Sequence, residues 1–93
     1  MLQIENKHRQ IINSILSKYP YKFYAYGSRT KNQAKKYSDL DLCFYERIPW
    51  NIFSHIQEDL EESELPFKVE LVNWQWMNTN FQESIEGDLT PIN

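Results

Sequence analysis

Two aspartates separated by a single residue, Asp39 and Asp41, are the part of the sequence best suited to chemistry. They open an apolar run typical of a strand, and residues two apart on a strand point to the same face. Carboxylates held so close together repel one another, so a cation is needed beside them. A hard divalent cation with oxygen ligands fits, because it neutralises both groups and can bridge to a phosphate. The pair therefore predicts a metal-binding site.

A glycine followed by a serine, Gly27-Ser28, lies upstream of the aspartates and is separated from them by a polar, basic stretch. Glycine lets a backbone approach an anion closely, and serine offers a hydroxyl donor. A chain that folds back would place this turn beside Asp39 and Asp41. The Gly27-Ser28 turn and the two carboxylates would then face the same ligand, a phosphate group held through a metal ion.

Gly27-Ser28, a spacer of ten residues and Asp39-Leu40-Asp41-Leu42 resemble the signature of the DNA polymerase beta-type nucleotidyltransferase superfamily. More closely, Gly-Ser-Arg followed by Tyr-Ser-Asp-Leu-Asp-Leu resembles the minimal nucleotidyltransferase (MNT) domains. These are short bacterial and archaeal proteins, usually paired with a HEPN-domain partner. The order of the expected elements and the chain length also match this family. The signal is specific because turn, spacer and carboxylate pair must all coincide.

The resemblance implies catalytic and metal-binding roles for three carboxylates, namely Asp39, Asp41 and Glu70. It implies nucleotide binding by Gly27, Ser28, Arg29 and Ser38. Two Mg²⁺ ions, or Mn²⁺ in their place, would be the cofactors, and ATP would be the substrate. Arg29 would stabilise charge on the leaving pyrophosphate, since its planar fork suits phosphate oxygens. The alternative for Arg29 is a surface cation without such a role.

Glu70 is a lone acid in an apolar, sheet-forming run, where family members usually carry aspartate in a Val-Asp-Leu-Val context. Glutamate is one methylene longer than aspartate, and this allows two interpretations. Either Glu70 holds the same proton or metal at a shifted position, or its presence indicates weakened catalysis. A third interpretation is a glutamate on an edge strand that simply points into solvent.

Length and composition narrow the class of protein. Ninety-three residues are expected to form one small domain, 1–93, with a limited core. A net charge of −3 argues against a general nucleic-acid binder, although Arg29, Lys31, Lys35 and Lys36 form a local basic patch. Cys43 is the only cysteine, so a reducing cytoplasm fits. Neither a signal-peptide pattern nor an apolar run of roughly 20 residues is present, so we expect no membrane span.

Hydrophobic periodicity and turn residues predict an α+β fold with helices flanking a sheet. Helices are expected at 3–18, 50–62 and 79–86, and strands at 21–26, 39–45 and 67–73. Residues 29–35 form either one short helix or a solvated loop, and residues from Leu89 onward form a tail that is either mobile or docked on a partner. Leu40, Leu42 and Phe44 are expected to face the core. The family resemblance implies a mixed sheet of three strands, as in the polymerase beta palm.

Two functions from different classes remain. In the first, the protein transfers AMP from ATP to a hydroxyl; the resemblance implies a tyrosine of a HEPN-type toxin as acceptor, and hence an antitoxin. In the second, it is a catalytically weak or inactive nucleotide-binding module that neutralises its partner by complex formation. The intact Gly-Ser and Asp-Leu-Asp motifs favour the first, whereas Glu70 and the small size favour the second. A small-molecule or nucleic-acid substrate is disfavoured, unless a second chain supplies a further domain, because this chain has little room to recognise an acceptor alone.

Overall fold

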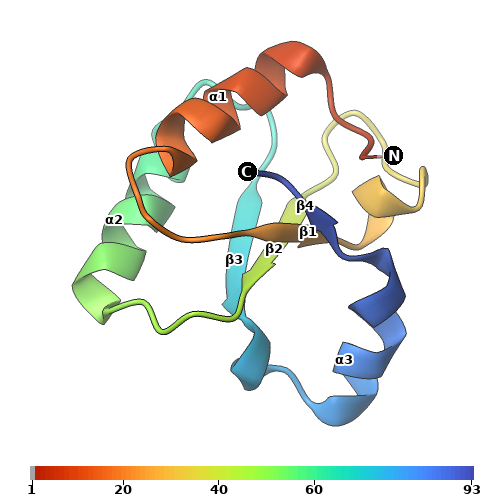
Figure 1. Cartoon of the computed structure of the whole chain (residues 1–93). Helices are drawn as coiled ribbons and strands as arrows, with labels where there is room; N and C mark the ends of the chain where they lie inside the picture. Colours follow the sequence, from red (N-terminus) through yellow and green to blue (C-terminus); the bar gives the residue numbers. More distant parts are fainter. Residues whose placement is uncertain (1) are drawn as a thin grey trace.

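The computed structural model describes residues 2–93, and over this range four strands form one sheet (Figure 1). The strands are β1 (Tyr24–Tyr26), β2 (Leu40–Phe44), β3 (Val69–Asn73) and β4 (Thr90–Pro91). The helices are α1 (Asn6–Leu16), α2 (Trp50–Glu61) and α3 (Thr79–Ile85). Single 3₁₀ turns lie at Ser28–Thr30, Trp74–Trp76 and Glu86–Asp88. The strand order is β3-β2-β1-β4, with β2 and β3 parallel and β1 antiparallel to both of its neighbours.

The predicted α+β class and mixed sheet are confirmed, but the expected count of three strands is wrong for the described residues. The fourth strand is the pair Thr90–Pro91, which lies along β1. Asn93 fastens it, because its side-chain oxygen accepts from the Phe23 N–H at 2.9 Å. Proline is tolerated there because β4 is an edge strand, where a missing donor costs little. The segment from Leu89 onward is therefore part of the sheet.

Alternation along β2 divides its side chains between two layers. Leu40, Leu42 and Phe44 are fully buried in the larger core, as the sequence predicts. That core also contains apolar residues of α1 and α2, which pack against each other (Figure 1). Asp41 and Cys43 point to the opposite face, where Cys43 joins a small cluster with Ile85 of α3. The pleat thus places the Asp41 carboxylate outside the main core.

Two predicted helical segments are shorter than expected. The first helix begins at Asn6 instead of residue 3, because the Gln3 N–H donates to the carbonyl of Arg29 at 2.7 Å. Residues 29–35 contain only the end of one 3₁₀ turn, so the loop alternative is the correct one. Asn32 has a φ of 56°, a left-handed conformation that interrupts any helix and that asparagine tolerates. Over residues 2–93, no helix is long and apolar enough to cross a membrane.

Candidate active site

The register of β2 and β3 places two of the predicted carboxylates side by side. Asp41 pairs with Glu70 across the parallel strands, and each is the second residue of its strand. Asp39 lies just before β2 and is exposed to solvent. On the other side of Asp41, β1 contributes Tyr26 as the antiparallel partner. The fold therefore gathers Asp39, Asp41 and Glu70 at the start of the two parallel strands.

The electrostatics of Asp41 reflect this crowding. The pKa of its carboxyl is raised from 3.8 to about 6, mainly by burial and in addition by the negative charges of Glu70 and Asp39. A carboxyl that is both desolvated and surrounded by like charges is stabilised by any cation that binds beside it. Perturbed carboxyl groups of this kind are more frequent in functional sites than elsewhere on a protein.

Gly27 lies directly against the Asp41 carboxylate. Its φ is +85°, a conformation that side chains rarely adopt, and a Cβ at this position would stand 2.7 Å from the Asp41 Oδ2. A side chain at this position would therefore be strained by the backbone and would also clash with Asp41. The absence of a side chain at Gly27 is thus what allows the backbone to approach Asp41 this closely.

The turn that follows Gly27 is held by its own hydrogen bonds. The Thr30 N–H and hydroxyl both donate to the Gly27 carbonyl, at 3.0 and 2.7 Å. The Ser28 carbonyl accepts from the Gln33 N–H at 3.0 Å. The Ser28 side chain is half-buried, and among the described residues its hydroxyl takes part in none of the side-chain hydrogen bonds. The turn therefore fixes the Ser28 backbone while leaving the hydroxyl available to a ligand.

Arg29 is buried beside the loop that leads to Asp39. Its side chain is only 5% exposed, so the surface-cation alternative is wrong. Its guanidinium donates to main-chain carbonyls and lies 4.2 Å from the centre of the Phe67 ring. Burial lowers the pKa of Arg29, while the nearby Asp39 charge raises it. Contact between Arg29 and pyrophosphate stays a prediction, and the guanidinium is already engaged with the chain itself.

The fourth predicted nucleotide-binding residue, Ser38, lies at the end of the loop and adjoins Asp39. Its hydroxyl accepts from the Lys35 N–H at 2.8 Å. Its carbonyl accepts from Arg29. Both contacts hold the loop before β2. Ser38 therefore lies next to Asp39 in the chain, but its hydroxyl is bonded to the loop backbone.

The carboxylates offer the all-oxygen donor set that hard divalent cations prefer. Asp39 and Asp41 fit such an ion because they come from one short segment and because Asp41 is destabilised in its charged form. Glu70 is instead exposed, and its Oε1 lies 3.6 Å from the Lys68 Nζ. Within residues 2–93, no three acidic, histidine or cysteine side chains converge closely enough to hold a metal. The fit to a cation therefore rests on the two aspartates.

A cavity of about 870 Å³ lies behind the loop, between the start of α1 and residues 29–36. Its basic lining residues are Arg29, Lys31, Lys35 and Lys36, so the basic patch predicted from the sequence lies around it. None of the three carboxylates lines this cavity. It separates the loop from α1, and it is distinct from the side on which Gly27 meets Asp41.

Two residues near the site were missed by sequence reasoning. Tyr26 is 7% exposed and pairs with Asp41; burial first, and then the Asp41 charge, raise the pKa of its hydroxyl to about 12. Its position just before Gly27 was the available signal. Gln3 was assigned to a helix, but its side chain contacts Ala34 in the loop. No local pattern indicates a contact over this distance along the chain.

Comparison with known proteins gives three similarities. The family model described as "Polymerase beta, Nucleotidyltransferase" matches residues 10–91. The chain is 36% identical over 88 residues to a protein of Haemophilus influenzae described as probable protein adenylyltransferase MntA, covering 90% of this chain and 77% of that one. A crystal structure from Sulfolobus solfataricus, assigned as a nucleotidyltransferase, superposes with a TM-score of 0.50 at 16% identity, over 90% of this chain and 74% of that one. Because the sequence identity to this structure is only 16%, the match supports the fold and not a function.

Proposed function

The chain belongs to the polymerase beta nucleotidyltransferase family, and on that premise we propose that it transfers AMP from ATP to a hydroxyl group on a protein. The observation that carries the proposal is the close approach of the Gly27 backbone to the Asp41 carboxylate, where a Cβ would stand 2.7 Å from Oδ2, with the charges of Asp39 and Glu70 nearby. This arrangement joins a phosphate-binding turn to a cation-binding pair. Protein as the acceptor class is supported by the description of the Haemophilus relative as a protein adenylyltransferase.

In this proposal each residue of the chain has a separate task. Asp39 and Asp41 hold Mg²⁺, with Mn²⁺ as a substitute. The Gly27 backbone and the Ser28 hydroxyl hold the β- and γ-phosphates. A bound divalent cation supplies charge neutralisation on the triphosphate. Glu70 lies next to Asp41 on the exposed edge and accepts the proton of the attacking hydroxyl.

The reaction balances as a displacement at the α-phosphorus. The acceptor oxygen forms a bond to phosphorus while the bond from that phosphorus to the β-phosphate oxygen breaks. Pyrophosphate leaves, and the hydroxyl proton passes to Glu70. We propose a tyrosine of a HEPN-type toxin as the acceptor and an antitoxin role for this chain. The similarity to MNT domains supports this partner, as does a fold with little surface of its own for recognising a small substrate.

One observation favours a second function. The Glu70 carboxylate pairs with Lys68, and no third carboxylate completes a metal-binding group within residues 2–93. A site in that state would bind a nucleotide with little turnover. The protein would then neutralise its partner by forming a complex, as a nucleotide-binding module.

The test combines the purified chain, the protein encoded next to it as the proposed HEPN-type partner, Mg²⁺ and ATP, followed by intact-mass spectrometry of both chains. We expect the neighbour to gain the mass of AMP, and we expect the gain to disappear with Asp39→Asn. Asp59→Asn is the control, because Asp59 lies on α2 and bonds to Tyr19, away from the carboxylates. Co-purification of the two chains without any adduct would reject transfer and support the binding module.

A further inference from the structure

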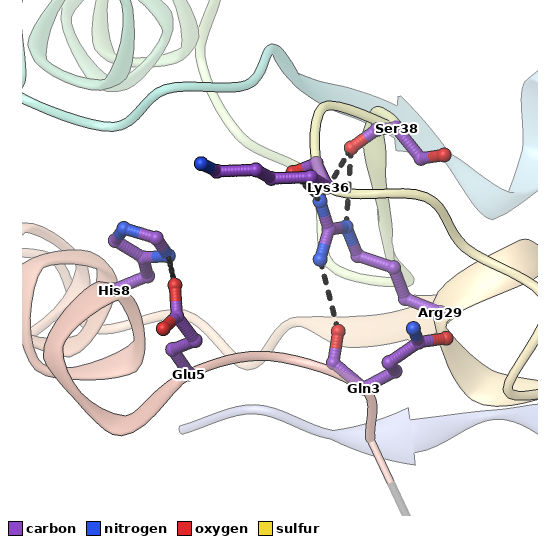
Figure 2. A network of polar contacts seen from close by, with 6 residues as sticks. All are labelled: Gln3, Glu5, His8, Arg29, Lys36 and Ser38. Carbon is purple, nitrogen blue, oxygen red and sulfur yellow. Dashed lines mark hydrogen bonds and ion pairs between the residues drawn. The ribbon is translucent and has the colours of Figure 1, made fainter.

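We infer that Gln3 and Arg29 form a clamp that fixes the loop of residues 31–38 and thereby positions Asp39. Both are positioning residues, since they contact the loop that carries Asp39 and do not contact the substrate. The inference deepens the proposed nucleotidyl transfer and rests on it for the activity that the clamp serves. The contacts themselves are observed in the structure (Figure 2).

Gln3 provides the first half of the clamp. Its side-chain amide contacts the backbone of Ala34 twice: Nε2 donates to the Ala34 carbonyl at 2.8 Å, and Oε1 accepts from the Ala34 N–H at 3.0 Å. Its own backbone N–H donates to the Arg29 carbonyl at 2.7 Å. A side-chain amide used in this way replaces the pairing that a neighbouring strand would give the loop. The middle of the loop is therefore tied to the segment before α1.

Arg29 provides the second half. Its Nη1 donates to the Gln3 carbonyl at 2.9 Å, and its Nε and Nη2 donate to the Ser38 carbonyl at 3.1 and 2.7 Å. Nη2 also lies 3.4 Å from the Lys36 carbonyl. Figure 2 shows the guanidinium between Gln3 on one side and Ser38 on the other. Because Ser38 precedes Asp39 in the chain, these bonds set the position from which Asp39 projects.

The loop has few other contacts with the rest of the chain. The Gln33 N–H donates to the Ser28 carbonyl at 3.0 Å, and the Lys31 Nζ lies 3.5 Å from the Asp88 Oδ2 in a partly exposed ion pair. The cavity of about 870 Å³ lies between the loop and the start of α1. Hydrogen bonds from a buried guanidinium are stronger than those between neutral groups, and they are costly to leave unmade. The clamp is thus expected to restrain the segment that leads to Asp39 more than the exposed ion pair does.

The geometry distinguishes positioning from direct phosphate binding. Every hydrogen bond that the Arg29 guanidinium makes within residues 2–93 goes to a main-chain carbonyl, and one face of the group lies on Phe67. A lysine ammonium lacks the planar fork needed to reach the Gln3 and Ser38 carbonyls together. Arg29→Lys therefore keeps the charge but breaks the clamp, whereas a phosphate-binding cation would tolerate this change better.

The kinetic test uses Gln3→Ala, Arg29→Lys and the double variant, with Gln10→Ala and Arg47→Lys as exposed controls. We expect kcat to fall by about tenfold or more in each single variant while KM for ATP changes by less than about threefold. The double variant should be about as slow as Arg29→Lys alone, because residues of one network are not additive. A raised KM for ATP in Arg29→Lys, with Gln3→Ala unchanged, would overturn the inference in favour of direct phosphate contact.

A second readout tests the clamp without any transfer. Amide hydrogen exchange of Ala34, followed by NMR, should be about tenfold faster in Gln3→Ala and Arg29→Lys than in the wild-type protein. The Leu42 amide in β2 should be unchanged, which shows that the domain remains folded. If the wild-type protein transfers nothing, the proposed function fails while the exchange result still decides on the clamp. Unchanged Ala34 exchange in both variants would reject the clamp whatever the activity.

Discussion

Asp41 and Glu70 are paired by the sheet register but have opposite surroundings. Asp41 is half-buried under the Gly27 backbone, and its pKa is raised to about 6. Glu70 is exposed and pairs with the exposed Lys68 side chain. One half of the site is thus fixed by backbone geometry, while the other half consists of side chains in solvent. This difference explains why a longer acid can stand at Glu70, whereas the glycine and the aspartate leave no such freedom.

The largest effect on stability is expected from Gly27→Ala, which breaks the fixed half. The new Cβ would stand 2.7 Å from Asp41 Oδ2 on a backbone with a φ of +85°. We expect a loss of about 1–3 kcal/mol in the free energy of unfolding. Transfer should fall by about 100-fold or more, because Asp41 is displaced. Urea denaturation and the rate of adduct formation measure the two effects.

Gly87→Ala is the matched control for this prediction. Among the described residues, nothing lies within 4 Å of a Cβ built at Gly87, and its φ is not positive. Stability and transfer should therefore both stay close to wild type. Equal losses in the two variants would show that the contact between Gly27 and Asp41 has no special role.

Asp41→Asn should abolish transfer while stabilising the fold. The pKa of Asp41 is higher in the folded protein, so the folded state binds more protons between pH 3.8 and about 6. Protonated Asp41 contributes stability to the folded protein below this pH window, and that contribution is lost as the pH rises through the window. Asparagine is never charged, so Asp41→Asn does not lose it. The variant should therefore be about 1 kcal/mol more stable than wild type near neutral pH, after allowance for solvent screening.

Denaturation of both proteins across this pH range, with and without Mg²⁺, measures the effect. Mg²⁺ should stabilise the wild-type protein near neutral pH and leave Asp41→Asn unaffected, because the ion binds the charged carboxylate. A less stable variant, or equal stabilisation of the two proteins by Mg²⁺, would argue against a cation site at Asp41.

Much of this arrangement could be predicted from the sequence, because it is encoded locally. The motif around Gly27 and the two aspartates identified the family, and alternation along β2 gave the correct faces for Leu40 and Asp41. Contacts between distant segments could not be predicted. Burial of Arg29 depends on carbonyls of Gln3 and Ser38 that only the folded chain brings together. Similarly, β4 is a two-residue strand that contains proline, a pattern typical of a loop.

The smallest effect on stability is expected at Glu70, in the exposed half. Glu70→Gln should lower the transfer rate by about 100-fold, because the proton acceptor is lost. Glu70→Asp should stay within about tenfold of wild type, and both variants should keep their stability within about 0.5 kcal/mol, since the pair with Lys68 is exposed. Steady-state rates of adduct formation test this, with Glu64→Gln as the exposed control. Equal rates in Glu70→Gln and wild type would remove Glu70 from the chemistry.

The most direct test of nucleotidyl transfer compares ATP labelled at the α-phosphate with ATP labelled at the γ-phosphate, in the presence of Mg²⁺ and the protein encoded next to this chain, which is the proposed HEPN-type partner. Transfer of AMP predicts that the α-label becomes attached to protein while the γ-label is released as pyrophosphate, and that Asp41→Asn stops both. Attachment of the γ-label would identify a phosphotransferase instead. If both labels remain in intact ATP, the result would contradict catalysis by this site.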